Sequence, residues 1–171
     1  MSNPARNTDT GLSQEATSVV PVAHTVAAST HLPEGIVNLA SVRLITDDLP
    51  RLVAFYEHVT GLVAERPTPD FAELHTAGGT LAIGSTRTVA LFAPGSARPS
   101  DNRSAIVEFL VDDVDDVAAR LADGSVEVVA GPTTMPWGNR SLLVPDPDGT
   151  LVNLFTPVTD AAGAKFAGTP R

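Results

Sequence analysis

The chain contains one pattern of a strand followed by a helix twice. Residues 42–56 have a counterpart in residues 107–121, and in both runs an aspartate, Asp48 or Asp113, ends an alternating strand and begins an amphipathic helix. Aspartate at that place is a preferred helix cap. A chain built from two copies of one unit has a pseudo-twofold axis, so the cleft between the copies is the expected ligand site.

Short strands follow the helix in each copy. The first copy predicts strands at 39–46, 62–66, 71–76, 80–85 and 88–92, with a helix from Asp48 to Gly61; the second predicts strands at 105–111, 126–130, 141–144 and 151–155, with a helix at 114–122. One such unit cannot cover both faces of its own sheet, so two must pair. The sequence therefore predicts an α+β fold of two tandem βαβββ modules whose mixed sheets form an open-sided barrel or cleft.

Composition divides the rest of the chain. Residues 1–35 are rich in Ser, Thr and Ala and have no sustained period, which predicts a flexible N-terminal tail. The predicted order is then a first module at 36–92, a turn-rich linker at 93–103, a second module at 104–158 and a loose C-terminal tail at 159–171.

Charge and cysteine content narrow the function classes. The net charge of −9 disfavours nucleic acid and anionic membranes as partners. The 171 residues include no cysteine, so thiolate ligands and disulfides are excluded. No apolar run is long enough to cross a bilayer, and the first residues do not read as a secretory leader. We expect a cytoplasmic protein.

Three motifs give the chain a family resemblance. They are the run from Asp48-Leu through Phe55-Tyr to Gly61-Leu, the loop Pro136-Trp-Gly-Asn-Arg140 and the turn Asp146-Pro-Asp-Gly149. With them the chain resembles the vicinal oxygen chelate superfamily, which includes glyoxalase I, bleomycin-resistance proteins and extradiol dioxygenases. The resemblance covers roughly residues 37–157 and implies the paired βαβββ fold and a homodimer. It does not imply one activity, because one fold carries many chemistries.

Metal-using members of that superfamily hold a divalent ion with His or Glu on the first and last strands of each copy. Aligned through the two helix caps and a recurring Gly-Thr-Leu tripeptide, the corresponding positions here are Ser41, Ile106, Ile83 and Asn153. None of these carries an imidazole or a carboxylate, which first-row divalent ions require. The resemblance therefore predicts no cofactor at the standard positions.

Two charged residues occupy equivalent places in the two first strands. Arg43 and Glu108 are expected to face the cleft, either as a structural ion pair or as a site in which Arg43 binds an anionic or carbonyl oxygen and Glu108 moves a proton. A third alternative is a non-standard metal site that joins Glu108 to Glu73 and His75.

The loop at 136–140 is a candidate lid. Trp137 is expected to stack on a planar ligand while Asn139 or Arg140 supplies polar contacts, unless the loop is only a packed turn at Gly138. The complete predicted ligand-binding set is Ser41, His75, Ile106, Trp137, Asn139, Arg140 and Asn153.

Two functions follow from these residues. The first is a small-molecule-binding protein of the bleomycin-resistance type, which holds a hydrophobic or planar ligand between the modules. The alternative is a glyoxalase- or dioxygenase-like lyase, isomerase or oxygenase, which uses either a non-standard metal site or metal-free acid–base catalysis by Glu108.

Overall fold

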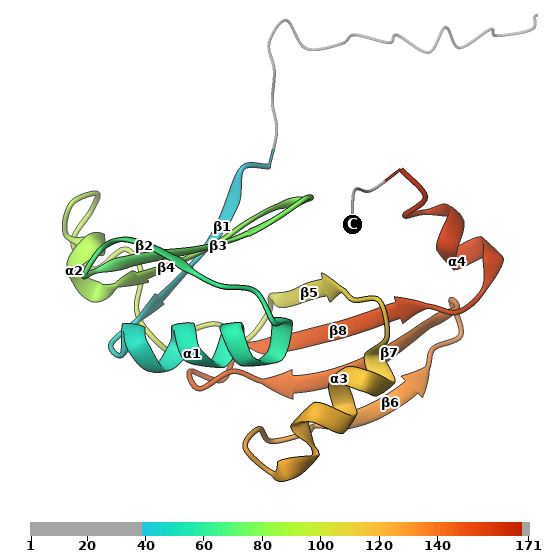
Figure 1. Cartoon of the computed structure of the whole chain (residues 1–171). Coiled ribbons are helices and arrows are strands. Elements are labelled where there is room, and N and C mark those ends of the chain that lie inside the picture. The colour runs from blue at the N-terminus through green and yellow to red at the C-terminus, as the bar shows by residue number, and fades with distance from the viewer. Residues whose placement is uncertain (1–38, 169–171) are drawn as a thin grey trace, which may run out of the picture. The chain divides into compact units, whose positions relative to one another are not determined.

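The computed structural model describes residues 39–168, so the predicted N-terminal tail lies outside the described residues. Two four-stranded sheets with their helices make up this part of the chain (Figure 1). The first module contains β1 (Ser41–Thr46), α1 (Leu49–Thr60), β2 (Glu65–Thr68), β3 (Phe71–Thr76), β4 (Gly79–Ser85) and α2 (Thr86–Val89). The second contains β5 (Ile106–Leu110), α3 (Val114–Arg120), the 3-10 helix η1 (Leu121–Asp123), β6 (Ala130–Thr134), β7 (Asn139–Pro145), β8 (Leu151–Pro157) and α4 (Asp160–Ala164).

Both sheets have the same strand order. The first sheet runs β1-β4-β3-β2 and the second β5-β8-β7-β6, and in each the first strand is parallel to the last while the other pairs are antiparallel. The α+β class and the two tandem βαβββ modules are thereby confirmed. The sheets remain two separate mixed sheets and do not close into a barrel.

Helix α1 forms where the sequence predicts it. Its N-cap Asp48 accepts the Arg51 backbone N–H at 3.1 Å, and Gly61 ends it with a φ of 74°. Such a positive φ favours glycine because a Cβ would clash. The buried residues of α1 are Leu49, Leu52, Val53, Tyr56 and Val59. They give the helix one apolar side, which lies against β3 and β4.

Helix α3 repeats this arrangement in the second module. Asp113 accepts the backbone N–H groups of Asp115 and Asp116, and η1 extends the helix to Gly124, whose φ is 79°. The predicted stripe of Val114, Val117 and Leu121 is buried. Both helix starts and both helix ends follow from the sequence.

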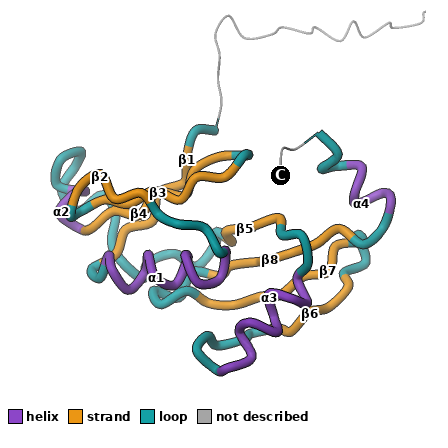
Figure 2. The backbone as a smooth tube through the Cα atoms, viewed as in Figure 1, coloured by secondary structure: helices purple, strands orange, loops and turns teal. Residues whose placement is uncertain are grey.

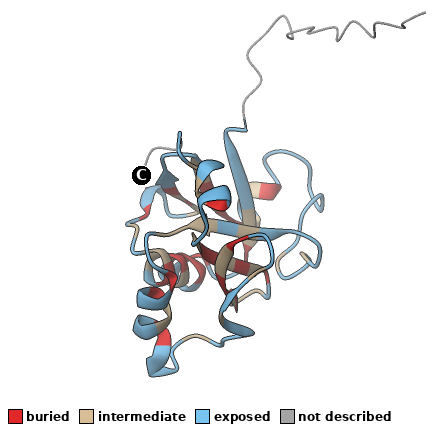
Figure 3. Ribbon diagram, turned by 90° about the vertical axis from the view of Figure 1, so that its right-hand side faces the viewer, coloured by how far each residue is buried: buried red, intermediate tan, exposed pale blue. Residues whose placement is uncertain are grey.

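Each sheet has an outer face that its helix covers and an opposite inner face. Leu44 of β1 and Val107 of β5 pack against the core, so their strand neighbours point to the inner faces. The inner-face residues are Ser41, Arg43 and Ile45 in β1, and Ile106, Glu108 and Leu110 in β5. Buried residues gather where the helices meet the strands (Figure 3).

One buried hydrogen bond joins the two modules. The Tyr56 hydroxyl of α1 donates to Asp146 Oδ2 in the turn between β7 and β8 at 2.9 Å. Asp146 Oδ1 also accepts the backbone N–H groups of Asp148 and Thr150. This carboxylate therefore organises the predicted turn, and it fixes α1 to the second module.

A short helix follows the last strand of each module, α2 after β4 and α4 after β8 (Figure 2). Helix α2 lies so close to the inner face that a Cβ on Gly84 would meet Thr88 Oγ1 at 2.6 Å. At the matching place in β8 stands Phe155, whose ring centroid lies 5.4 Å from that of Phe166, just beyond α4. Each module thus folds its own C-terminal end over part of its inner face.

Three sequence predictions of local structure are wrong. The predicted strand at 88–92 is instead the end of α2 and a turn, in which Phe92 N–H donates to Val89 O. The predicted strand at 126–130 begins only at Ala130, because Val126 packs toward the core instead of pairing. The predicted loose tail from Thr159 forms α4, which Thr159 caps and in which Ala162 is buried.

Candidate functional site

The inner face of the first module carries three rows of side chains across its strands. Strand register places Arg43 opposite Ala82, and Ala82 opposite Glu73. The next row toward the start of β1 joins Ser41, Thr80 and His75, and the row on the other side joins Ile45, Gly84 and Phe71. This face therefore combines a cation, acids and an aromatic ring.

The Arg43 guanidinium lies over two aromatic rings. Its Cζ is 4.9 Å from the centroid of Phe71 on β3 and 5.2 Å from that of Phe92 after α2. Within residues 39–168, Arg43 forms neither a hydrogen bond nor an ion pair. The rings hold the guanidinium by cation–π attraction while its N–H donors stay unpaired.

His75 is held by its neighbours on this face. Its Nδ1 lies 3.1 Å from Thr80 Oγ1, and its Nε2 lies 3.6 Å from Glu65 Oε2. Ser41, which the sequence analysis grouped with it, lies in the same row and is exposed. The structure therefore brings Ser41 and His75 together on one face.

The inner face of the second module is centred on Glu108 and Asn153. Register places Asn153 between Glu108 and Leu143, and Asn153 Nδ2 donates to Glu108 Oε1 at 2.7 Å. Asn153 Oδ1 is buried without a hydrogen-bond partner. Ile106, one row away, is 50% exposed. This half of the site consequently offers oxygen acceptors beside apolar surface.

The expected ion pair between Arg43 and Glu108 is wrong. Within the described part of the chain, Arg43 lies over Phe71 and Phe92, and Glu108 accepts a hydrogen bond from Asn153. The two residues occupy equivalent positions of the repeat, each on its own sheet. Each charge has found partners within its own module.

The predicted alignment of the metal-ligand positions in β4 and β8 is wrong by one residue. The alignment through Gly-Thr-Leu made Ile83 equivalent to Asn153, but Ile83 is fully buried on the outer face, and the true counterpart is Ala82. The hairpin before β4 is shorter than the one before β8, which displaces the tripeptide by one residue.

The described residues do not supply a metal-binding set. No three His, Cys, Asp or Glu side chains in residues 39–168 come together in a group that could hold an ion. His75 and Glu73 lie on the first sheet and Glu108 on the second. The donors of the described residues therefore do not fit the divalent ion that metal-using relatives hold.

The three residues of the predicted lid, Trp137, Asn139 and Arg140, have different surroundings in the structure. Trp137 is 60% exposed in a turn whose Gly138 has a φ of 90° and packs tightly against Thr159. Asn139 begins β7 and is half-buried. Arg140 reaches α3 instead, where its Nε donates to Asp115 Oδ2 at 2.7 Å. This contact lowers the pKa of the Asp115 carboxyl.

Asp146 and Tyr56 are titratable groups with shifted pKa values. Burial raises the pKa of the Asp146 carboxyl, and the hydrogen bonds that it accepts offset part of that shift. Burial and the neighbouring carboxylate raise the pKa of the Tyr56 phenol far above its ordinary value. Both side chains are buried at the junction of the modules, so their role is structural.

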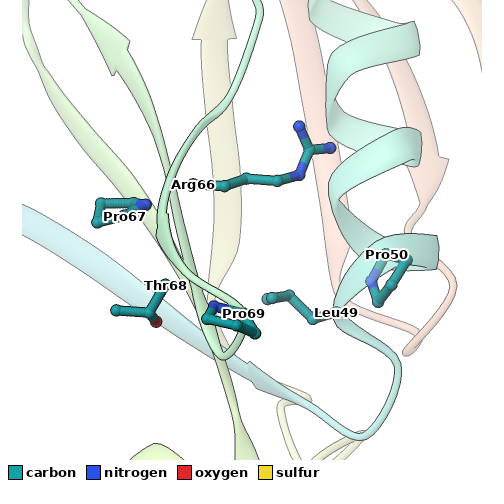
Figure 4. A pocket seen from close by; sticks show the side chains of 6 residues that line it. All are labelled: Leu49, Pro50, Arg66, Pro67, Thr68 and Pro69. Atoms are coloured by element: carbon teal, nitrogen blue, oxygen red, sulfur yellow. The ribbon is translucent and has the colours of Figure 1, made fainter.

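One of two cavities in the described chain reaches the inner-face rows, because Arg43 and Ile45 line the smaller one. The larger, of about 380 Å³, is a groove between the start of α1 and β2 (Figure 4). Its lining residues are Leu49, Pro50, Arg66, Pro67, Thr68 and Pro69. The smaller, of about 130 Å³, lies between Arg43 to Leu52, the 97–102 linker and the Asp146 turn. The smaller cavity is below the size of a typical ligand pocket.

Sequence reasoning missed Phe71 and Phe92 as site residues. One signal for Phe92 was present, since Ala90-Leu-Phe-Ala93 recurs as Ala164-Lys-Phe-Ala167. The two phenylalanines follow the equivalent helices α2 and α4. The internal repeat thus extends beyond the βαβββ unit to the residues that fold back over each sheet.

Comparison with known proteins gives a family and a fold. The model of the Glyoxalase/Bleomycin resistance protein/Dioxygenase superfamily matches residues 38–154. A comparison with curated proteins finds no match to this chain.

Solved structures with this fold come from several bacteria. A glyoxalase/bleomycin resistance protein/dioxygenase from Nocardioides is 22% identical with a TM-score of 0.61, covering 75% of this chain and 89% of its own. A family enzyme from Burkholderia phytofirmans PsJN is 19% identical with a TM-score of 0.61, covering 71% and 100%. TioX from Micromonospora sp. ML1 is 24% identical with a TM-score of 0.55, covering 71% and 99%. These likenesses show the fold.

Proposed function

Because this chain belongs to the Glyoxalase/Bleomycin resistance protein/Dioxygenase superfamily, we propose that it is a small-molecule-binding protein of the bleomycin-resistance type. It holds a hydrophobic or planar ligand against the inner faces of its sheets. The observation that carries this proposal is the Arg43 guanidinium, which lies over Phe71 and Phe92 and has no ion pair with a described residue. A cation and aromatic rings together on an exposed sheet face suit a planar organic molecule.

The ligand site is proposed to be completed in a homodimer. Apolar side chains on or beside the inner faces are exposed, including Leu91, Phe92 and Ile106. Exposed apolar patches of this kind mark interaction sites. Sedimentation velocity over a concentration series tests the dimer, and a monomer at all concentrations contradicts it.

A ligand screen with the full chain tests the proposed function. Thermal shift measurements against planar aromatic and aliphatic compounds should find binders, because ligands that bind only the folded state raise the melting temperature. Phe92→Ala should lower the affinity for those compounds roughly ten-fold, since stacking between aromatic rings contributes about 1 kcal/mol or more. Val63→Ala, an exposed apolar residue between α1 and β2, is the matched control. A library without any binder refutes the proposal.

The second candidate function is metal-free acid–base catalysis by Glu108. Its support is the hydrogen bond from Asn153, which orients the Glu108 carboxylate on the inner face of the second module. An enzyme of this type loses turnover in Glu108→Gln but still binds substrate. A binding protein shows only a modest change of affinity in the same variant. Turnover that survives Glu108→Gln unchanged eliminates the acid–base version.

A further inference from the structure

Arg43 has no ion pair within residues 39–168, and this points to the charge of the ligand. Four arginines of the described chain pair with acids, namely Arg66 with Glu57, Arg87 with Asp70, Arg98 with Asp101 and Arg140 with Asp115, whereas Arg43, Arg51, Arg103 and Arg120 have no ion pair with a described residue. Arg43 is exposed on the inner face with an acid, Glu73, two strands away in the same row, yet the two do not pair. Among the described arginines without an ion pair, Arg43 is distinguished by its guanidinium, which lies over the aromatic rings of Phe71 and Phe92.

We infer that the inner face of the first module binds a planar aromatic carboxylate, with the carboxylate on Arg43 and the ring beside Phe92. This inference rests on the proposed function and adds the chemical class of the ligand. A guanidinium is planar and presents paired N–H donors that match a carboxylate. Contact with two rings restricts where the guanidinium lies, so binding has less ordering to impose on it.

The surrounding residues suit such a ligand. Phe92 is 74% exposed, so one side of its ring is open for stacking. The acids of this face, Glu65 and Glu73, lie on β2 and β3, while Arg43 lies on the edge strand β1. Strands are about 4.8 Å apart, so Glu73 stands roughly 10 Å from Arg43 along the row. At that distance salt screens most of its repulsion of a bound carboxylate.

The test compares 2-naphthoate with its neutral isostere 2-naphthamide on the full chain by isothermal titration calorimetry. Naphthoate should bind about 10- to 100-fold more tightly, because charge-assisted hydrogen bonds are the stronger ones. Arg43→Gln should remove that preference, and Arg43→Lys should keep only part of it. The matched control is Arg51→Gln on the exposed side of α1, which makes the same charge change and should leave naphthoate binding unaltered.

The outcomes separate this inference from the proposed function. Equal affinity for naphthoate and naphthamide, or no binding of naphthoate, overturns the inference. The thermal shift screen tests the proposed function independently. If it finds only neutral or cationic compounds that bind, the proposed function stands and the inference does not. A naphthoate preference that persists in Arg43→Gln also overturns the inference. Amide and arginine Nε–H shifts in NMR spectra should locate naphthoate at β1 and at the turn after α2.

Discussion

The two modules share one order of elements but treat their inner faces differently. In the second module, Phe155 occupies an inner position of β8 and packs against Phe166, and it is only 6% exposed. In the first module the same position is Gly84, and Thr88 of α2 occupies the space that a side chain would need. The phenylalanine after α2 is consequently left exposed and stacks on Arg43.

This difference shows how one residue can decide the use of a repeated unit. A large side chain at this inner position gives the following segment an apolar surface to cover, and the segment becomes part of the core. A glycine at that position lets the helix lie against the backbone, and the next aromatic, Phe92, stays exposed. The first module therefore leaves its aromatic side chain exposed at this end, whereas the second module buries it.

The largest expected effect is the loss of Phe155. Phe155→Ala should lower the free energy of unfolding by about 3–5 kcal/mol, because a buried aromatic is replaced by a cavity. Urea denaturation measures the change. The control is Phe92→Ala, which removes the exposed counterpart and should cost less than about 0.5 kcal/mol. Equal costs at the two positions contradict the difference drawn between the modules.

Filling the space at Gly84 should have the next largest effect. Gly84→Ala should destabilise the chain by about 1–3 kcal/mol, since its Cβ would overlap Thr88 Oγ1. Adding Thr88→Ala should recover much of that loss when compared with Thr88→Ala alone in a double-mutant cycle. Gly131→Ala is the control, because nothing lies within 4 Å of a Cβ there. An additive cycle refutes the clash.

Substitution of the two helix-capping aspartates should lower the free energy of unfolding by smaller amounts, which differ between the two caps. Asp113 accepts two backbone N–H groups and Asp48 accepts one. Asp113→Ala should therefore cost about 1–2 kcal/mol, and Asp48→Ala about 1 kcal/mol or less. Thermal unfolding of both variants measures the order, with the Asn variants as controls that keep an acceptor oxygen. The reverse order contradicts a capping role set by the number of bonds.

Sequence patterns predicted the elements that local chemistry determines. The boundaries of α1 and α3 follow from an aspartate, an apolar stripe and a glycine, which all lie within the helix and its two ends. Helices α2 and α4 were missed because they are too short to show a period, and packing against the sheet holds them. Residues 88–92 were predicted as a strand because the end of α2 is too short to show a helical period, while its apolar residues alternate as in a strand.

For the candidate site residues, the sequence predicted which face of the strand each side chain lies on, but not its contacts with other elements. Strand alternation put Arg43 and Glu108 on the inner faces, as the structure does. The contacts of Arg43 were not predictable, because Phe71 and Phe92 reach it through strand pairing and through the fold of the chain after α2. The pairing of Arg140 with Asp115 was not predictable either, because Asp115 lies on another element.

The smallest expected effect distinguishes the two hairpins by their response to pH. In the first module a neutral acceptor, Thr76 Oγ1, receives the backbone N–H groups of Gly78 and Gly79. In the second, the buried carboxylate of Asp146 does so for its own turn. Only the second hairpin can therefore carry a charge that burial penalises.

Asp146→Asn should isolate this pH dependence. Because burial raises the pKa of Asp146 in the folded state, the folded chain retains that proton better than the unfolded chain. The Asp146 contribution is thus greatest at acidic pH and declines as pH rises from the ordinary carboxyl pKa through the raised folded value. Asparagine keeps an oxygen for the two N–H groups, so the change at neutral pH should stay within about 1 kcal/mol.

The measurement is the difference in unfolding free energy between the wild type and Asp146→Asn, taken from about pH 3 to about pH 8. The other carboxyl groups titrate in both proteins, so their contributions cancel. The wild type should lose stability relative to the variant as pH rises and then level off. Thr76→Val, the matched change in the first hairpin, should shift the free energy by a constant amount. A constant shift in both hairpins would mean that the buried carboxylate is satisfied as fully as the hydroxyl.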